Sequence, residues 1–198
     1  MKEDLSNIFP MSKTKTLKGT RRLIREKILQ IIFSYKVSET DLDLLFSHIF
    51  SRDFNFGDNE EKILKNKLLK PDEVFELEAD VPILWTAFEV EFAQQLLRKT
   101  LDNSSMIDEK LKSTTSNWDF DRISLIDRIL IEIACAEFIS FSEIPTKVTM
   151  NEAIDIAKKY STDKSGIFIN GILDSMLNSF KKEGLVNKAG RGLKDSKE

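Results

Sequence analysis

The sequence predicts an all-α protein of about seven helices, and three features of its 198 residues support this fold class. Seven Gly and four Pro are too few for the many tight turns of an all-β protein. Apolar residues recur at the helical spacing of three and four, whereas no segment alternates in the manner of a strand. Apolar residues make up 41% and charged residues 32%, which is typical of a globular chain.

Residues 20–50 predict two helices, the first over 20–38 and the second over 38–50. The first begins with several cations, which oppose the helix macrodipole at a cost of about 0.3–1 kcal/mol each, so helix stability does not explain them. Ser38 or Thr40 is the expected N-cap of the second helix. The expected inward positions are Ile24, Ile28, Ile31, Ile32 and Tyr35 in the first helix, and Leu42, Leu45, Phe46 and Ile49 in the second.

The acidic stretch over about 50–80 is weakly periodic, and we interpret it as a variable insertion. It predicts one helical stretch around 60–69, which Pro71 ends. Pro82 then predicts the start of a strong helix over 82–103, followed by a short helix over 106–115. The inward stripe of the longer helix is expected to contain Leu84, Phe88, Phe92 and Leu96.

Residues 117–182 predict the last three helices. A long apolar helix over 117–140 is expected at the centre of the fold. The next helix, over 146–161, is expected to begin with a capping box in which the Thr149 hydroxyl accepts a hydrogen bond and Glu152 reaches back. The last helix is expected to run from Ser165 to Lys182.

We expect one helical domain over 19–182, between a flexible basic leader (1–18) and a flexible basic tail (183–198). The net charge is only −3, but residues 1–36 carry nine Lys or Arg against three Asp or Glu, and residues 146–198 carry ten against seven. The middle of the chain is acidic. Both ends can therefore build a basic stripe that binds nucleic acid, although ordinary solvated charge explains the pattern equally well.

The residue types give no support to enzymatic chemistry. The only histidine, His48, lies among large apolar residues and is interpreted as a partly buried structural residue. Cys135 lies between alanines and is expected to pack as a small hydrophobic residue. No nucleotide-binding or metalloprotease motif occurs, so we expect no catalytic residue, metal or cofactor. The chain shows no signal peptide or membrane-spanning run, and its single Cys fits a reducing cytoplasm.

Binding is the remaining class of function. Arginines at the start of the first helix and lysines near the junction of the last two helices can contact phosphates. Phe168 offers a platform on which an unpaired base can stack, although packing in the core explains this residue equally well. The candidate phosphate contacts are Arg21, Arg22, Arg25, Lys158, Lys159 and Lys164.

Four segments carry a family resemblance. They are RRLIREKILQIIFSY (21–35), DRISLIDRILIEIACAEF (121–138), IPTKV (144–148) and TMNEAIDIAKKYSTDKSGIFING (149–171). Together they resemble the NusB family of bacterial transcription antitermination factors. The resemblance covers nearly the whole chain apart from residues 1–18, about 50–80 and the tail.

The resemblance implies two packed helical subdomains, no catalysis, and a heterodimer with NusE, a protein of the small ribosomal subunit. That pair binds the boxA element of nascent ribosomal RNA leader transcripts and helps RNA polymerase to read through terminators. By position, the resemblance implies RNA contacts at Arg21, Arg22, Arg25, Lys164, Ser165 and Phe168, beside the candidate Lys158, and NusE contacts at Phe33 and Asp127.

Two alternatives remain open. A similar helical module precedes the catalytic domain of some ribosomal RNA cytosine methyltransferases; that reading is expected to fail if residue 198 is the true end of the gene product. Some members of the family also self-associate, so a homodimer that covers the arginines is the other alternative.

Overall fold

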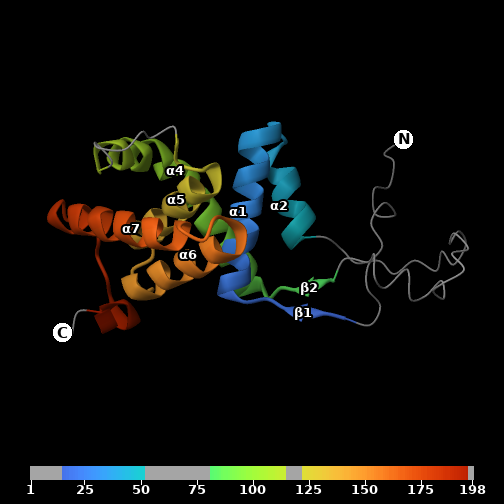
Figure 1. Cartoon of the computed structure of the whole chain (residues 1–198). Helices are drawn as coiled ribbons and strands as arrows, with labels where there is room; N and C mark the ends of the chain where they lie inside the picture. The colour runs from blue at the N-terminus through green and yellow to red at the C-terminus, as the bar shows by residue number, and fades with distance from the viewer. Residues whose placement is uncertain (1–14, 52–80, 115–121, 196–198) are drawn as a thin grey trace, which may run out of the picture.

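The computed structural model describes residues 15–51, 81–114 and 122–195, and within these ranges it confirms the all-α prediction (Figure 1). Two short strands, β1 (Leu17–Lys18) and β2 (Ile83–Leu84), form a parallel pair. The predicted helix around 60–69 lies outside the described residues. The helices are α1 (Arg21–Ser38), α2 (Leu42–Phe50), α4 (Ala87–Thr114), α5 (Leu125–Ser140), α6 (Thr146–Tyr160) and α7 (Ser165–Lys182), with a final 3-10 turn at Gly190–Asp195.

Local hydrogen bonds define the ends of α1 and α2. The Thr20 hydroxyl accepts from the amide of Leu23 at 3.1 Å, and α1 ends where Glu39 takes a left-handed conformation with φ of 53°. Asp41, rather than Ser38 or Thr40, is the N-cap of α2, since its carboxylate accepts from the amide of Leu44 at 2.9 Å. The four predicted inward isoleucines of α1 are buried, whereas Tyr35 is exposed.

The start and length of α4 differ from the prediction. Pro82 does not begin a helix, because Ile83 and Leu84 are extended and pair with β1. The helix begins after Thr86, which exchanges hydrogen bonds with Glu89 in a capping box: the Thr86 amide donates to the Glu89 carboxylate at 2.8 Å, and the Glu89 amide donates to the Thr86 hydroxyl at 3.3 Å. It then continues without a break to Thr114.

The later start changes which side chains of this region are buried. Phe92 and Leu96 are buried as predicted. Leu84 and Phe88 are instead 56% and 84% exposed, because Leu84 lies on a strand and Phe88 is on the outer side of the first helical turn.

The predicted capping box at the start of α6 is wrong. This helix begins at Thr146, directly after Pro145, so Thr149 lies inside the helix and is buried. Its hydroxyl is 3.5 Å from the carbonyl oxygen of Pro145. Glu152 is therefore free of any capping role, and its carboxylate instead accepts hydrogen bonds from Arg22 of α1.

Helix α5 lies at the centre of the fold, as the sequence predicts, and contacts α1, α4, α6 and α7 (Figure 1). Its residues Ile129 to Phe138 are all buried, and Cys135 packs among them with its thiol 3.8 Å from the sulfur of Met176. The α1–α2 pair packs on one side of the α4–α7 bundle, which gives the two packed subdomains (Figure 1). His48, in contrast to the prediction, is exposed on α2.

The tail expected to be flexible is docked as far as Asp195. The Lys188 ammonium donates to the carbonyl oxygen of Phe141 at 2.8 Å, and the Ala189 amide donates to that of Ser142 at 3.0 Å. Gly192 fits closely, because a Cβ atom on it would lie 2.0 Å from the Ser142 carbonyl oxygen. At the other end, Leu17 and Lys18 of the predicted leader are paired in β1, and residues 1–14 lie outside the described ranges.

Candidate nucleic-acid interface

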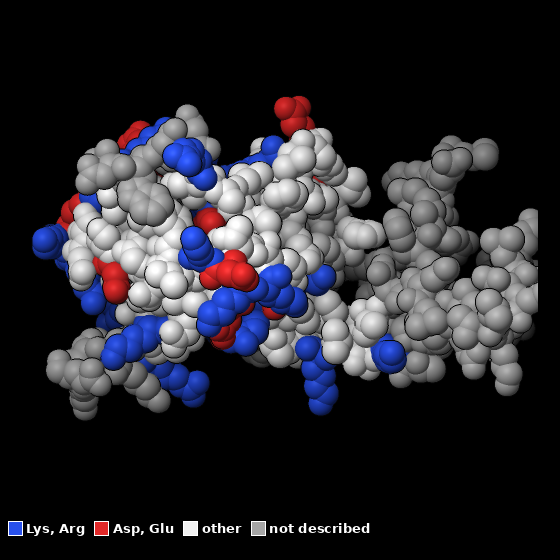
Figure 2. All heavy atoms as spheres, viewed as in Figure 1, with Lys and Arg blue, Asp and Glu red and all other residues white. Residues whose placement is uncertain are grey.

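The start of α1, the end of α6 and the start of α7 meet at one surface, which we call the basic face. In Figure 2, blue and red atoms lie side by side over the region that α6 occupies in Figure 1. The predicted phosphate contacts are thus interleaved with carboxylates. The exposed cations of the basic face are Arg21, Arg22, Lys158, Lys159 and Lys164.

Arg22 joins α1 to α6 through two carboxylates. Its Nε and Nη2 donate to the two oxygens of Glu152, both at 2.9 Å, and Nη2 also donates to Asp155 at 2.8 Å. These hydrogen bonds, chiefly those to Glu152, raise the pKa of the guanidinium above its ordinary value. The Arg22 side chain nevertheless remains half exposed, so it can contact a ligand from the position in which α6 holds it.

Arg25 is not on the surface, which corrects the expected position of this predicted RNA contact. The residue is 4% exposed, and its guanidinium forms a bidentate pair with Glu137 of α5, whose side chain is fully buried. The pair forms because Arg25 follows the inward stripe of α1 and faces the only helix that is buried on every side. A direct contact between Arg25 and a ligand would require this pair to separate.

A second ionic contact fixes the end of α6 on α1. Glu26 is buried, and one of its carboxylate oxygens accepts from the Lys159 ammonium at 2.7 Å and from the Tyr160 hydroxyl at 2.8 Å. The hydrogen bond to Glu26 raises the pKa of Lys159. Burial, and then the hydrogen bond to Glu26, raise the pKa of Tyr160. Lys159 is therefore an anchored cation of the basic face.

Ser165 and Asp127 are both buried and contact each other, which corrects their expected positions on the surface. The Ser165 hydroxyl donates to one oxygen of Asp127 at 2.9 Å and lies 2.8 Å from the hydroxyl of Thr162. The other Asp127 oxygen has no hydrogen-bond partner among the described residues. Because the contact joins the first turns of α5 and α7, it sets the position of the two residues that flank Ser165.

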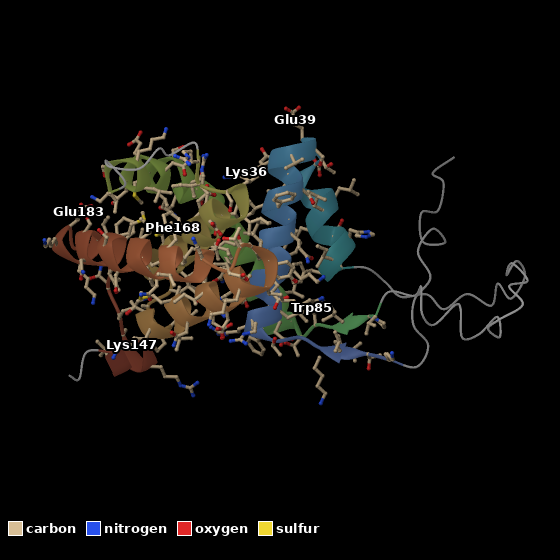
Figure 3. The ribbon with its side chains drawn as sticks, viewed as in Figure 1. Lys36, Glu39, Trp85, Lys147, Phe168 and Glu183 are labelled. Carbon is tan, nitrogen blue, oxygen red and sulfur yellow. The ribbon has the colours of Figure 1, made fainter. Side chains whose placement is uncertain are left out.

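Lys164 and Phe168 are the flanking residues that can reach a ligand. Lys164 is exposed directly before α7, and Lys158 is exposed near the end of α6, 3.5 Å from Asp155. Phe168 lies on α7 (Figure 3) and is half-buried against the core, so both of its sequence-based interpretations describe part of its ring. The α7 start thus presents one cation and one partly accessible aromatic side chain.

Phe33 is exposed on a different surface. It lies on α1 beyond the arginines, and 37% of it is exposed. Val37 of α1 and Leu44 of α2 are exposed to 61% and 59%. Apolar side chains exposed on neighbouring helices are typical of a surface that binds another protein.

Arg21 is the remaining arginine of the predicted set. Its guanidinium lies 4.5 Å from the centre of the Phe92 ring and 3.9 Å from the Glu143 carboxylate, with the side chain half exposed. Among the described residues, no group of His, Cys, Asp and Glu could hold a metal ion, and no helix is long and apolar enough to cross a membrane. The features of this surface are those of phosphate binding.

The acidic partners of the arginines were missed at the sequence level. Glu137 carried a usable signal, because a carboxylate within the apolar run of α5 requires a buried cation. Glu152 and Asp155 gave no such signal, since alternate charged residues on a half-exposed helix are ordinary.

Comparisons with known proteins agree with this geometry. Residues 86–178 match the model of the NusB family. The transcription antitermination protein NusB of Chloroherpeton thalassium is 34% identical over 176 residues, which cover 89% of this chain and 70% of the relative.

Two solved structures share the fold. That of T. maritima NusB has a TM-score of 0.57 at 27% identity and covers 82% of this chain and 93% of its own. A structure of antitermination factors NusB and NusE in complex with dsRNA has a TM-score of 0.57 at 16% identity, and covers 80% of this chain and 96% of its own. The second similarity concerns the fold alone.

Proposed function

Because this chain belongs to the NusB family of transcription antitermination proteins, we propose that it is an RNA-binding antitermination factor that acts with NusE. In this proposal the pair binds boxA RNA of nascent ribosomal RNA transcripts and promotes read-through by RNA polymerase, which it meets only indirectly. The relatives' name and the structure of a NusB–NusE pair with RNA support this function.

The observation that carries the proposal is the basic face. Cations from three helices, Arg21 and Arg22 of α1, Lys158 of α6 and Lys164 before α7, are exposed on it. Arginine can donate two parallel hydrogen bonds to a phosphate, and the exposed part of Phe168 can stack on a base. In this proposal Arg25 and Ser165 act as positioning residues, because both are buried.

NusE is proposed to bind the α1–α2 surface around Phe33. The exposed Val37 and Leu44 support this site, because burial of such side chains is favourable on association. Asp127 is proposed to act from inside the protein, by holding Ser165, and not by touching NusE. The proposed activity involves no catalysis, metal or cofactor, and its proposed location is the cytoplasm, where bacterial transcripts are made.

The test is a binding measurement with the full chain, its own NusE, and two RNAs that contain boxA or its scrambled sequence. We expect tighter binding to boxA, with an affinity that falls as salt rises. Equal affinity for the two RNAs would exclude sequence-specific recognition, and no binding to either would exclude the function.

Paired substitutions locate the RNA contact. Arg21→Ala with Arg22→Ala should weaken RNA binding and reduce the salt dependence by about 0.7 for each phosphate contact to a single strand. NusE binding should not change. The matched control is Arg98→Ala with Lys99→Ala, which removes two exposed cations from α4 and should leave RNA binding intact.

A further inference from the structure

The basic face contains carboxylates where a polyanion is expected to bind. Arg22 is held by Glu152 and Asp155, which lie one helical turn apart on α6. Electrostatics alone predicts that both carboxylates repel RNA. The hydrogen-bond geometry of Arg22 distinguishes them.

The guanidinium offers five N–H donors arranged along its edges. The side edge, formed by Nε and one N–H of Nη2, is occupied by the two oxygens of Glu152. The end edge is formed by Nη1 and the other N–H of Nη2. Asp155 takes the Nη2 half of this end edge at 2.8 Å, whereas Nη1 donates no hydrogen bond within the described part of the chain.

Glu152 is the more deeply placed of the two carboxylates. Its side chain is 18% exposed and lies between Arg22 and the buried Arg25, whose Nη1 is 3.9 Å away. It therefore holds the guanidinium in one orientation from the protein side. The Asp155 side chain is 43% exposed and also lies 3.5 Å from the Lys158 ammonium, so it occupies donors on the solvent side.

We propose that the two carboxylates have opposite effects on RNA binding: Glu152 positions Arg22 for a backbone phosphate, and Asp155 competes with that phosphate for the end edge of the guanidinium. This inference rests on the proposed function. When RNA binds, a phosphate replaces Asp155 on Nη2 and gains Nη1, while the fork with Glu152 stays intact. Asp155 thereby sets an upper limit on the RNA affinity of the basic face.

The test compares Glu152→Gln with Asp155→Asn in the full chain with NusE and boxA RNA. Asp155→Asn should tighten binding about two- to fivefold, the scale of one exposed ion pair, and should steepen the salt dependence by about 0.7. Glu152→Gln should weaken binding at least about threefold, because an amide cannot accept both hydrogen bonds of the fork. The matched control is Asp102→Asn, which removes an exposed carboxylate paired with Arg98 on α4 and should change nothing.

Two results would overturn the inference. The first is a shift in the same direction for Glu152→Gln and Asp155→Asn, which repulsion alone predicts. The second is an unchanged gain from Asp155→Asn in an Arg22→Lys background, because an ammonium has no end edge for Asp155 to block. Thermal unfolding of each variant confirms that it is folded, and Asp155→Asn remains a sufficient test if Glu152→Gln is not. If the unaltered protein binds boxA RNA normally, such results reject this inference and leave the proposed function standing.

Discussion

The buried pair between Arg25 and Glu137 should control the stability of the whole fold. It joins α1 to α5 in a site where Arg25 is 4% exposed and Glu137 is fully buried. We consider the substitution Arg25→Met, which keeps a long apolar side chain but removes the cation.

The expected loss follows from burial. Removal of one partner leaves the other charge uncompensated in the interior, which costs about 3–5 kcal/mol. For a domain of this size, each kcal/mol corresponds to a change in melting temperature of about 2–4 °C. Arg25→Met should therefore lower the melting temperature by about 10 °C. The double variant Arg25→Met with Glu137→Leu should recover most of this loss, because an apolar pair needs no charge compensation.

Urea unfolding followed by circular dichroism at 222 nm measures these free energies. The matched control is Arg98→Met, which removes an exposed arginine of α4 and should change stability by less than about 0.5 kcal/mol. A loss below about 1 kcal/mol for Arg25→Met, or a double variant as unstable as the sum of the two single variants, would refute the reasoning. The result also decides how a loss of RNA binding in an Arg25 variant is interpreted, since an unstable protein binds less without having lost a contact.

Three further predictions concern other contacts. Asp127→Ala should lower stability by about 1–3 kcal/mol through loss of the Ser165 partner and should weaken RNA binding but not NusE binding in calorimetric titrations; a selective loss of NusE binding would return Asp127 to the partner surface. The raised pKa of Tyr160 means that the folded protein holds the phenolic proton more tightly than the unfolded chain, so the unfolding free energy should fall as pH rises above about 10, and Tyr160→Phe should reduce that fall in urea unfolding at pH 9 and 11. An equal fall in both proteins would contradict this cause. Gly192→Ala should release the tail and speed limited proteolysis after Gly184, because its Cβ would meet the Ser142 carbonyl oxygen, whereas Gly171→Ala, which has open space around it, should not.

The helices and most of the core were predictable from local patterns. The buried isoleucines of α1 and the central position of α5 followed from apolar spacing, because a helix must bury its apolar stripe whatever it packs against. The errors at α4 and α6 came from choosing between competing local signals. Pro82 and Thr149 are both acceptable at helix starts, and the choice fell to the β1–β2 pairing and to Pro145, respectively.

The candidate interface was predictable in its residue types and not in its geometry. The sequence by itself determined that cations gather at the start of α1 and around the α6–α7 junction, and that motifs of the NusB family occur in order. Only the tertiary structure decided that Arg22 is exposed while Arg25 is buried, and that Asp127 holds Ser165. The physical reason is that ion pairs such as Arg22–Glu152 and Arg25–Glu137 join residues more than 100 positions apart, so the role of each arginine depends on which helix packs beside it.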